Sequence, residues 1–303
     1  MWFKSARVYT GDFSDLEGIF KDDAEIEAAV QSVPFRPCQG GEKASAGFAP
    51  LFPDTGAYSF KTAGGVFLRV LEEAKLLPSS VVMSQLSEIV SKKEAELGRE
   101  IRKNEREALK TALVNQLLER AFPVRRDMLV YVQPQKGICA VSVSSAKRAE
   151  TAIALVRQAF TTFPARVPQP RCAAEDRITS WVSQGPVPEF FELGADTVLK
   201  SSDEDGGIIR ASREDLTSEE IAVHIKAGKL MTEIALTYKD ELFFVLGSDL
   251  SLKRMKPLDQ YLERALPEKT EDRTADLQSH LVIQGALLDE LIPYLFKLFD
   301  CEE

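Results

Sequence analysis

The sequence predicts an α+β protein in which antiparallel β-hairpins carry packed helices. Three observations support this class. Pairs of apolar, strand-like runs flank short turns that contain Gly or Pro, which is the pattern of a β-hairpin. Between the hairpins, apolar residues recur at helical spacing. The chain has 303 residues, 44% of them hydrophobic and 28% charged, a globular mixture long enough for two or three domains with a core of their own.

The N-terminal half is expected to contain a long helical region that begins at Pro78-Ser79-Ser80. Asn104 and Glu107 match a capping box, so we expect a break near residue 103 and a second helix to about residue 120. The apolar faces of the two helices are expected to be formed by Val82, Met83, Leu86, Val90, Leu97 and Ile101, and by Leu109, Leu113 and Leu117. The other elements expected in this half are a strand near 2–10, a helix over 13–31, a loop over 38–56 and a hairpin joining 58–60 to 66–70.

The C-terminal half is expected to alternate hairpins with helices. A proline-rich stretch at 164–171 is the best candidate for a linker. A helix capped by the box Thr217-x-x-Glu220 is expected to end at Gly228. The remaining expectations are a hairpin of 128–132 with 138–143, a helix capped by Ser144 to about Phe160, strands at 177–182, 207–211 and 251–255, a hairpin of 230–238 with 241–247, and a closing helix over 278–299.

Most catalytic signatures are absent from the sequence. It has no phosphate-binding glycine loop, no nucleophile elbow, and only two histidines, His224 and His280, which do not match a zinc motif. The acidic turn Asp203-Glu204-Asp205 fails the EF-hand pattern, because Gly207 stands where an oxygen ligand is required. The four cysteines are widely spaced, which suits a reducing cytosol. The N-terminus lacks the apolar run of a signal peptide, and no stretch is apolar enough to span a membrane.

Charge is unevenly distributed along the chain. The net charge of −9 alone argues against a polyanionic partner, but residues 79–126 contain 10 Lys/Arg and 7 Asp/Glu, a net of +3, while the remainder contains 28 and 40, a net of −12. Five cations recur in one helical stripe, within about 60° of one another on a continuous helix. They are Lys92, Arg99, Lys103, Arg106 and Lys110. A row of this kind suits phosphate binding. The alternative is an ordinary exposed helix, because interspersed glutamates allow i,i+4 ion pairs.

Three further features have two interpretations each. A basic patch over 251–257 contains Lys253 and Arg254, and a third patch is flanked by Arg210 and Arg213. Taken alone, the pattern of each patch favours ordinary solvated surface over a DNA contact. Phe122 follows Arg120-Ala121 at the expected helix tip. It is either part of the core or an exposed apolar residue that marks an interface.

Several segments together resemble the RdgC family, the bacterial recombination-associated proteins. They include Trp2-Phe3-Lys4, Glu119-Arg120-Ala121-Phe122 and Ser145-Ala146-Lys147-Arg148. The most specific is Glu204-Asp205-Gly206-Gly207-Ile208-Ile209-Arg210-Ala211, followed by Asp215-Leu216-Thr217-Ser218-Glu219-Glu220. His224-Ile225, Ala227-Gly228-Lys229 and Ser251-Leu252-Lys253-Arg254 come next. The likeness covers essentially the whole length in the same order.

The resemblance implies a ring-shaped homodimer with a basic hole through which double-stranded DNA passes. It also implies antagonism with the RecA recombinase, weaker binding of single-stranded DNA, and a cytoplasmic, nucleoid-associated location. The expected parts are a central α+β domain (1–75 plus 122–165), a protruding two-helix finger (76–121) and a base domain (166–303). Phe122 would lie in the dimer interface. Arg213 matches a position where a basic residue is expected, although its neighbour Ser212 is not basic.

The sequence therefore predicts a sequence-nonspecific DNA-binding protein that is not an enzyme and has no cofactor, metal or membrane partner. The residues expected to contact DNA are Lys92, Arg99, Lys103, Arg106, Lys110, Arg120, Arg213, Lys229, Lys253 and Arg254. Two alternatives are a metal-dependent DNA-processing enzyme and a scaffold whose basic helix binds an acidic protein partner.

Overall fold

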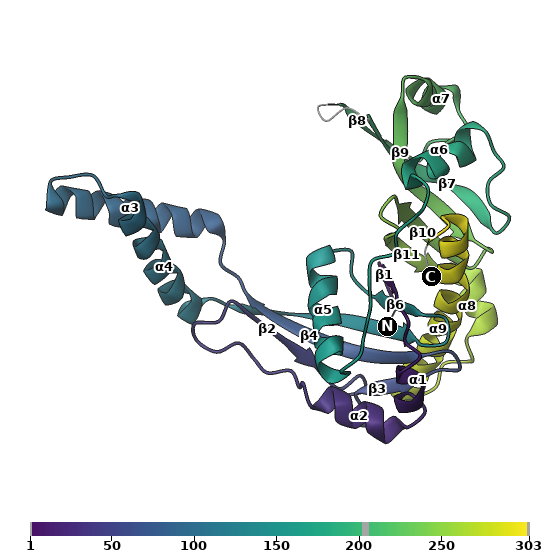
Figure 1. Cartoon of the computed structure of the whole chain (residues 1–303), viewed down its shortest axis with the longest axis horizontal. Helices are drawn as coiled ribbons and strands as arrows, with labels where there is room; N and C mark the ends of the chain where they lie inside the picture. The colour runs from purple at the N-terminus through teal and green to yellow at the C-terminus, as the bar shows by residue number, and fades with distance from the viewer. Residues whose placement is uncertain (1, 202–205, 302–303) are drawn as a thin grey trace. The chain divides into compact units, whose positions relative to one another are not determined.

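A computed structural model of the chain describes residues 2–201 and 206–301. It confirms the α+β class with antiparallel sheets (Figure 1). The chain forms two compact units. The larger unit comprises Met1–Val33, Pro50–Arg69 and Met128–Glu303, and the smaller comprises Pro34–Ala49 and Val70–Asp127. The division into three domains stays a prediction.

A five-stranded antiparallel sheet lies wholly within the larger unit, in the order β11-β10-β9-β7-β8. The expected hairpin of 230–238 with 241–247 is confirmed as β9 and β10, and the strands expected at 207–211 and 251–255 are β8 and β11. Their bounds are β7 (Phe191–Ser201), β8 (Ile208–Ser212), β9 (Lys229–Tyr238), β10 (Leu242–Gly247) and β11 (Leu252–Pro257).

The second sheet has the order β1-β6-β5-β4-β2, with β3 paired to β4. Its strands β4 and β5 contribute residues to both units. The expected hairpins of 58–60 with 66–70 and of 128–132 with 138–143 are confirmed. The bounds are β1 (Arg7–Thr10), β2 (Ala44–Phe48), β3 (Ser59–Lys61), β4 (Val66–Lys75), β5 (Pro123–Gln133) and β6 (Ile138–Val141).

The longer helices pack with an apolar face toward the core, as the buried residues of α5, α6 and α9 show. In the larger unit they are α1 (Leu16–Ile19), α2 (Asp23–Gln31), α5 (Ala146–Ala159), α6 (Ala174–Ser183), α7 (Glu219–Lys226), α8 (Asp259–Ala265) and α9 (Arg273–Leu298). The core of this unit joins aromatic residues of both sheets to α9, drawn in yellow in Figure 1; its largest members include Phe3, Phe67, Tyr131, Tyr238 and Phe299.

The smaller unit contains α3 (Ser79–Leu97) and α4 (Lys103–Arg120), which pack on one another. Val82, Leu86 and Leu113 form the buried centre of this pair, and Val90, Leu109 and Leu117 pack around it. These residues confirm most of the predicted apolar faces. Met83 and Leu97 were assigned wrongly, since they are 47% and 54% exposed. Ile101 was also assigned wrongly, since it lies between the two helices and belongs to neither.

Two expectations in the first sixty residues are wrong. The helix expected over 13–31 is two helices, because the Asp22 carboxylate accepts the Ala24 N–H and caps α2. The loop expected over 38–56 contains β2, which pairs with β4. Its Ala-Ser-Ala-Gly-Phe sequence lacks the β-branched residues that mark strands. Gly47 is needed there, because an added Cβ would lie 2.5 Å from the Phe35 backbone.

The predictions for the C-terminal half differ most from the structure. The strand expected at 177–182 is part of α6, which buries Ala174, Ile178 and Trp181 at helical spacing. Strand β7 and helix α8 were not expected. Three helix starts also differ: Ser145 caps α5 in place of Ser144, Ser218 precedes α7 in place of Thr217, and Asp272 caps α9 six residues before the expected start.

The break between α3 and α4 also differs from its prediction. Gly98 has a φ of 62° and ends α3 in the left-handed conformation, which glycine adopts at little cost. Residues 98–102 are not helical. The Glu105 carboxylate accepts the Arg102 N–H at 2.9 Å, so the N-terminal contact of α4 lies two residues earlier than the predicted Asn104–Glu107 box.

The packing of α3 on α4 should depend strongly on Leu86, which is 1% exposed. We expect Leu86→Ala to lower the free energy of unfolding of this pair by roughly 2–4 kcal/mol, because the truncation leaves a cavity. Met83→Ala, on an exposed position of the same helix, should change it by less than about 0.5 kcal/mol. Hydrogen exchange of the α3 and α4 amides measures both. Equal effects of the two substitutions would contradict the assigned helix face.

Stability should depend on pH through His280 of α9. Its Nδ1 accepts the Trp2 indole N–H at 2.8 Å, and burial lowers the pKa of His280 below its ordinary value of 6.5. The unfolded chain therefore binds a proton at a higher pH than the folded chain. We expect the free energy of unfolding to decrease as the pH falls below about 6.5 and to level off below the folded pKa. Urea unfolding at several pH values tests this. The decrease between pH 7.5 and 5.5 should be smaller in His280→Gln, and an identical profile would refute it.

Candidate nucleic-acid interface

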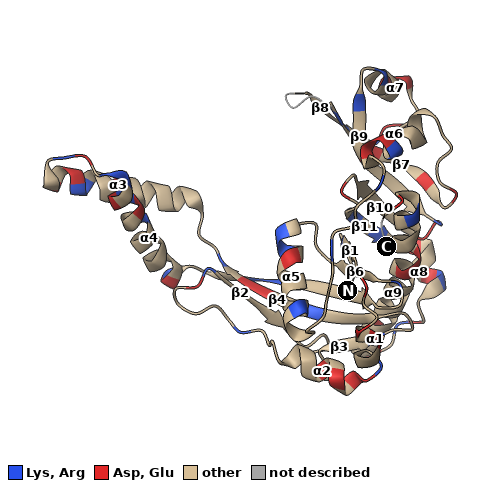
Figure 2. Ribbon diagram, in the orientation of Figure 1, with Lys and Arg blue, Asp and Glu red and all other residues tan. Residues whose placement is uncertain are grey.

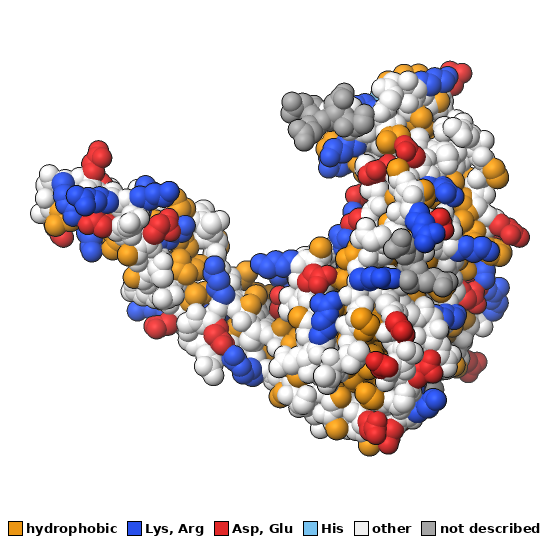
Figure 3. All heavy atoms as spheres, viewed as in Figure 1, with side chains coloured by type: hydrophobic (Ala, Val, Ile, Leu, Met, Phe, Trp, Pro, Cys, Tyr) orange, Lys and Arg blue, Asp and Glu red, His pale blue; other side chains and the backbone are white. Residues whose placement is uncertain are grey.

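Basic residues of the smaller unit lie on α3, on α4 and between the two helices, interspersed with acidic ones (Figures 2 and 3). Lys103, Arg106 and Lys110 follow one face of α4 at spacings of three and four residues. We call these three residues the α4 stripe. Lys103 and Arg106 are exposed and Lys110 is half-buried. Among the described residues, no hydrogen bond or ion pair engages these three side chains, so their charges face solvent.

Lys92 and Arg120 are exposed cations outside this stripe. Lys92 lies on α3, and Arg120 is the last residue of α4. The prediction of one continuous stripe from Lys92 to Lys110 is wrong, because the helix is interrupted at 98–102.

Arg99 lies in that interruption and is engaged within the protein. Its guanidinium donates to both carboxylate oxygens of Glu105, at 2.9 and 2.8 Å. The Arg99 hydrogen bond, together with the Arg102 N–H, lowers the pKa of Glu105 to about 2. A bidentate contact of this kind fixes the orientation of the guanidinium. Arg99 would have to leave Glu105 before it could bind a phosphate.

Phe122 is exposed, and the buried-core interpretation is wrong. Its side chain is 81% exposed, and it lies between the end of α4 and the start of β5. Its carbonyl accepts the N–H of Leu76, which is itself 55% exposed. Exposed apolar residues on two segments joined by a backbone hydrogen bond are a feature of interaction surfaces.

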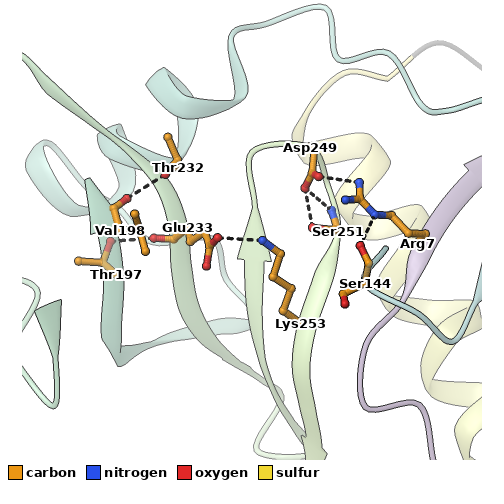
Figure 4. A network of polar contacts seen from close by, with 9 residues as sticks. All are labelled: Arg7, Ser144, Thr197, Val198, Thr232, Glu233, Asp249, Ser251 and Lys253. Carbon is orange, nitrogen blue, oxygen red and sulfur yellow. Dashed lines mark hydrogen bonds and ion pairs between the residues drawn. The ribbon is translucent and has the colours of Figure 1, made fainter. Parts of the chain in front are cut away.

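The cations predicted in the larger unit lie on its five-stranded sheet and at its ends. Lys253 and Arg254 are on β11, Lys229 begins β9, and Arg213 follows β8. Lys253 donates to Glu233 at 2.8 Å (Figure 4). Arg254 donates to Asp196 at 2.8 Å, and Lys229 donates to the Gly207 carbonyl at 2.9 Å. Arg213 is exposed. These cations therefore differ from the α4 stripe, since most have a partner within the chain.

Arg213 and Arg254 both have a left-handed backbone, with φ of 60° and 50°. This conformation costs a residue with a side chain roughly 1–2 kcal/mol. Arg254 lies where the register between β10 and β11 shifts, so it belongs to a β-bulge. Bulges redirect side chains, and strained residues of this kind cluster at functional sites.

Asp196 of β7 joins these two arginines. Its carboxylate accepts the Ser212 hydroxyl at 2.7 Å and the Arg213 N–H at 3.1 Å, besides the Arg254 guanidinium. These hydrogen bonds, that of Ser212 first, lower the pKa of Asp196. Sequence reasoning missed Asp196, because nothing in the local sequence distinguishes it among 47 acidic residues.

Figure 4 also shows a cation that was not predicted, Arg7 of β1. It donates to the Asp249 carboxylate at 2.5 Å and to the Ser144 carbonyl at 2.9 Å. Asp249 in turn accepts the Ser251 hydroxyl. These contacts tie β1 to the turn between β10 and β11.

Within residues 2–201 and 206–301, no three His, Cys, Asp or Glu side chains are grouped so that they could hold a metal ion. The acidic turn 203–205 lies outside the described residues. No helix in the described part of the chain is both long and apolar enough to cross a membrane.

Comparison with known proteins identifies the class. The sequence model of the family described as "Putative exonuclease, RdgC" matches residues 1–302. A protein of Aeromonas hydrophila subsp. hydrophila is 33% identical over 306 residues, which cover 100% of this chain and 99% of that protein. One of Pseudomonas aeruginosa strain LESB58 is 34% identical over 305 residues, covering 100% and 98%. Both are named recombination-associated proteins. The molecule is thus a protein of the recombination-associated class. The chain belongs to the RdgC family.

Proposed function

We propose that the protein binds double-stranded DNA without sequence preference, through phosphate contacts, and restrains recombination by RecA. The observation that carries this proposal is the α4 stripe: three cations on one helix face without partners in the described chain, in a protein whose net charge is −9. Cations that face solvent can replace the condensed counterions of DNA at no cost in broken ion pairs. Phosphate contacts set position and carry no sequence information.

Binding to unrelated duplexes tests the proposal directly. Gel shifts with three duplexes of equal length and different sequence should give similar affinities, and single-stranded DNA should bind more weakly. A strong preference for one duplex would refute sequence-blind binding. No shift at any salt concentration would favour the scaffold alternative, in which the basic helix binds an acidic protein.

We further propose a homodimer that encircles DNA, with 76–121 as a finger and Phe122 in one of two contacts between subunits. The exposure of Phe122 and Leu76 supports this, because a large apolar side chain that is 81% exposed gains most from burial. Sedimentation at micromolar concentration should show a dimer, and Phe122→Ser should shift it toward monomer. Leu97→Ser, at another exposed apolar position of the smaller unit, should leave the dimer intact. A monomer that binds DNA normally would contradict the ring.

The metal-dependent DNA-processing enzyme, already an alternative from the sequence, stays a second candidate because the family description names an exonuclease. Incubation of linear and circular duplexes with Mg²⁺ or Mn²⁺ tests it. We expect no shortening of either. Progressive loss of nucleotides from the ends would replace the binding function with a nuclease.

A further inference from the structure

Two of the three cations of β11, Lys253 and Arg254, each have a carboxylate partner from a different strand of the same sheet. Lys253 pairs with Glu233 of β9, and Arg254 pairs with Asp196 of β7, both at 2.8 Å. Asp196, Glu233 and Arg254 line one cavity of about 300 Å³, together with Arg210 and Ser212. This arrangement contrasts with the α4 stripe, whose cations have no such partners in the described chain.

In the Asp196–Arg254 pair, the carboxylate makes more hydrogen bonds to the rest of the protein than the guanidinium does. Asp196 is 21% exposed, and its carboxylate has two further donors, the Ser212 hydroxyl and the Arg213 N–H, both at the end of β8. Arg254 is 57% exposed and gives Asp196 one of its five N–H donors. The carboxylate would therefore stay in place if the guanidinium moved to another anion.

We propose that Asp196 and Glu233 compete with DNA phosphates for Arg254 and Lys253. In the absence of DNA, the two carboxylates pair with these cations, and a bound phosphodiester replaces the carboxylate as the partner of the cation. This inference rests on the proposed function and concerns how one part of it is regulated. A phosphate that reaches Arg254 must replace a carboxylate and also lie close to its negative charge. The larger unit should therefore bind DNA more weakly than its cations alone would allow, and the unpaired α4 stripe should bind first.

Removal of the competing charge tests the inference. Asp196→Asn keeps a side-chain oxygen that can accept from Ser212 and Arg213, but it removes the ion pair. We expect the affinity for duplex DNA to rise about tenfold at roughly 50 mM salt, the effect of one additional charge-assisted contact. The salt slope should steepen by about 0.9, the value for one phosphate.

The matched control is Glu192→Gln, which removes one negative charge from an exposed position of the same strand. It should raise affinity much less, because Glu192 has no cation partner among the described residues. In a background of Arg254→Gln, the Asp196→Asn effect should fall to the level of this control. A double-mutant cycle therefore separates release of Arg254 from a general change in charge.

Three results would overturn the inference. They are an Asp196→Asn effect no larger than that of Glu192→Gln, an undiminished effect without Arg254, and a loss of affinity, which would make Asp196 a residue that positions Arg254 for phosphate. A wild-type protein that binds no DNA would instead refute the proposed function. If Asp196→Asn fails to fold, Glu233→Gln with Lys253→Gln repeats the cycle on the second pair.

Discussion

Duplex DNA affinity is expected to fall by roughly 10³–10⁵ between about 50 and 200 mM salt, if about 6–10 phosphates are contacted. Ten cations were assigned to DNA contacts from the sequence. Six of them have no side-chain partner within residues 2–201 and 206–301 and are available at once: Lys92, Lys103, Arg106, Lys110, Arg120 and Arg213. Each phosphate that is neutralised releases condensed counterions, and added salt opposes this release.

Fluorescence anisotropy with a labelled duplex, titrated at five or six salt concentrations, measures this slope. A duplex of unrelated sequence is the control and should give the same slope. An affinity that hardly changes with salt would mean that the basic residues do not contact the backbone, and the proposed mode of binding would be wrong.

Charge reversal of the α4 stripe should strongly weaken the binding of duplex DNA. Replacement of Lys103, Arg106 and Lys110 by Glu should weaken binding by about a thousandfold at low salt, if each charge-assisted contact contributes about tenfold. The salt slope should flatten by about 2.7, at 0.9 for each lost phosphate contact. Arg99 is left out of this set, because Glu105 already holds its guanidinium.

A control with the same change in charge reverses Lys21, Lys147 and Lys269, three exposed residues of the larger unit that we do not propose to contact DNA. This variant should lose far less affinity and keep the wild-type slope. Thermal unfolding of both variants should match the wild type closely, since surface substitutions change stability by about 0.5 kcal/mol each. Equal losses in the two variants would show that net charge alone governs binding.

Local sequence determined the hairpins and the helix α4. Apolar runs on either side of turns such as 134–137 predict strand pairs, and Leu109, Leu113 and Leu117 predict the buried face of α4. Strand β7 was not predicted, because Gly194 and Asp196 interrupt the apolar pattern where the strand changes register against β9. Helix α6 was predicted to be a strand, because a short apolar run has no clear period.

Part of the candidate site could be predicted from the sequence, and part of it could not. The α4 stripe could be predicted from the sequence, because spacings of three and four residues define a helix face without any tertiary contact. The break at Gly98 was misplaced, so Arg99 and Lys92 were wrongly joined to that face. From the sequence, Phe122 could be either a core residue or an interface residue. The structure shows that its side chain is exposed.

Composition and helical spacing thus specify which residues carry charge and which of them share a helix. The pairing of charges that are distant in sequence depends on the fold. Asp196 and Arg254 are 58 residues apart in the chain and become partners because strands β7 and β11 belong to one sheet and a bulge redirects the arginine. Ion pairing depends on distances of a few ångströms between side chains, and for residues far apart in sequence those distances are set by strand pairing.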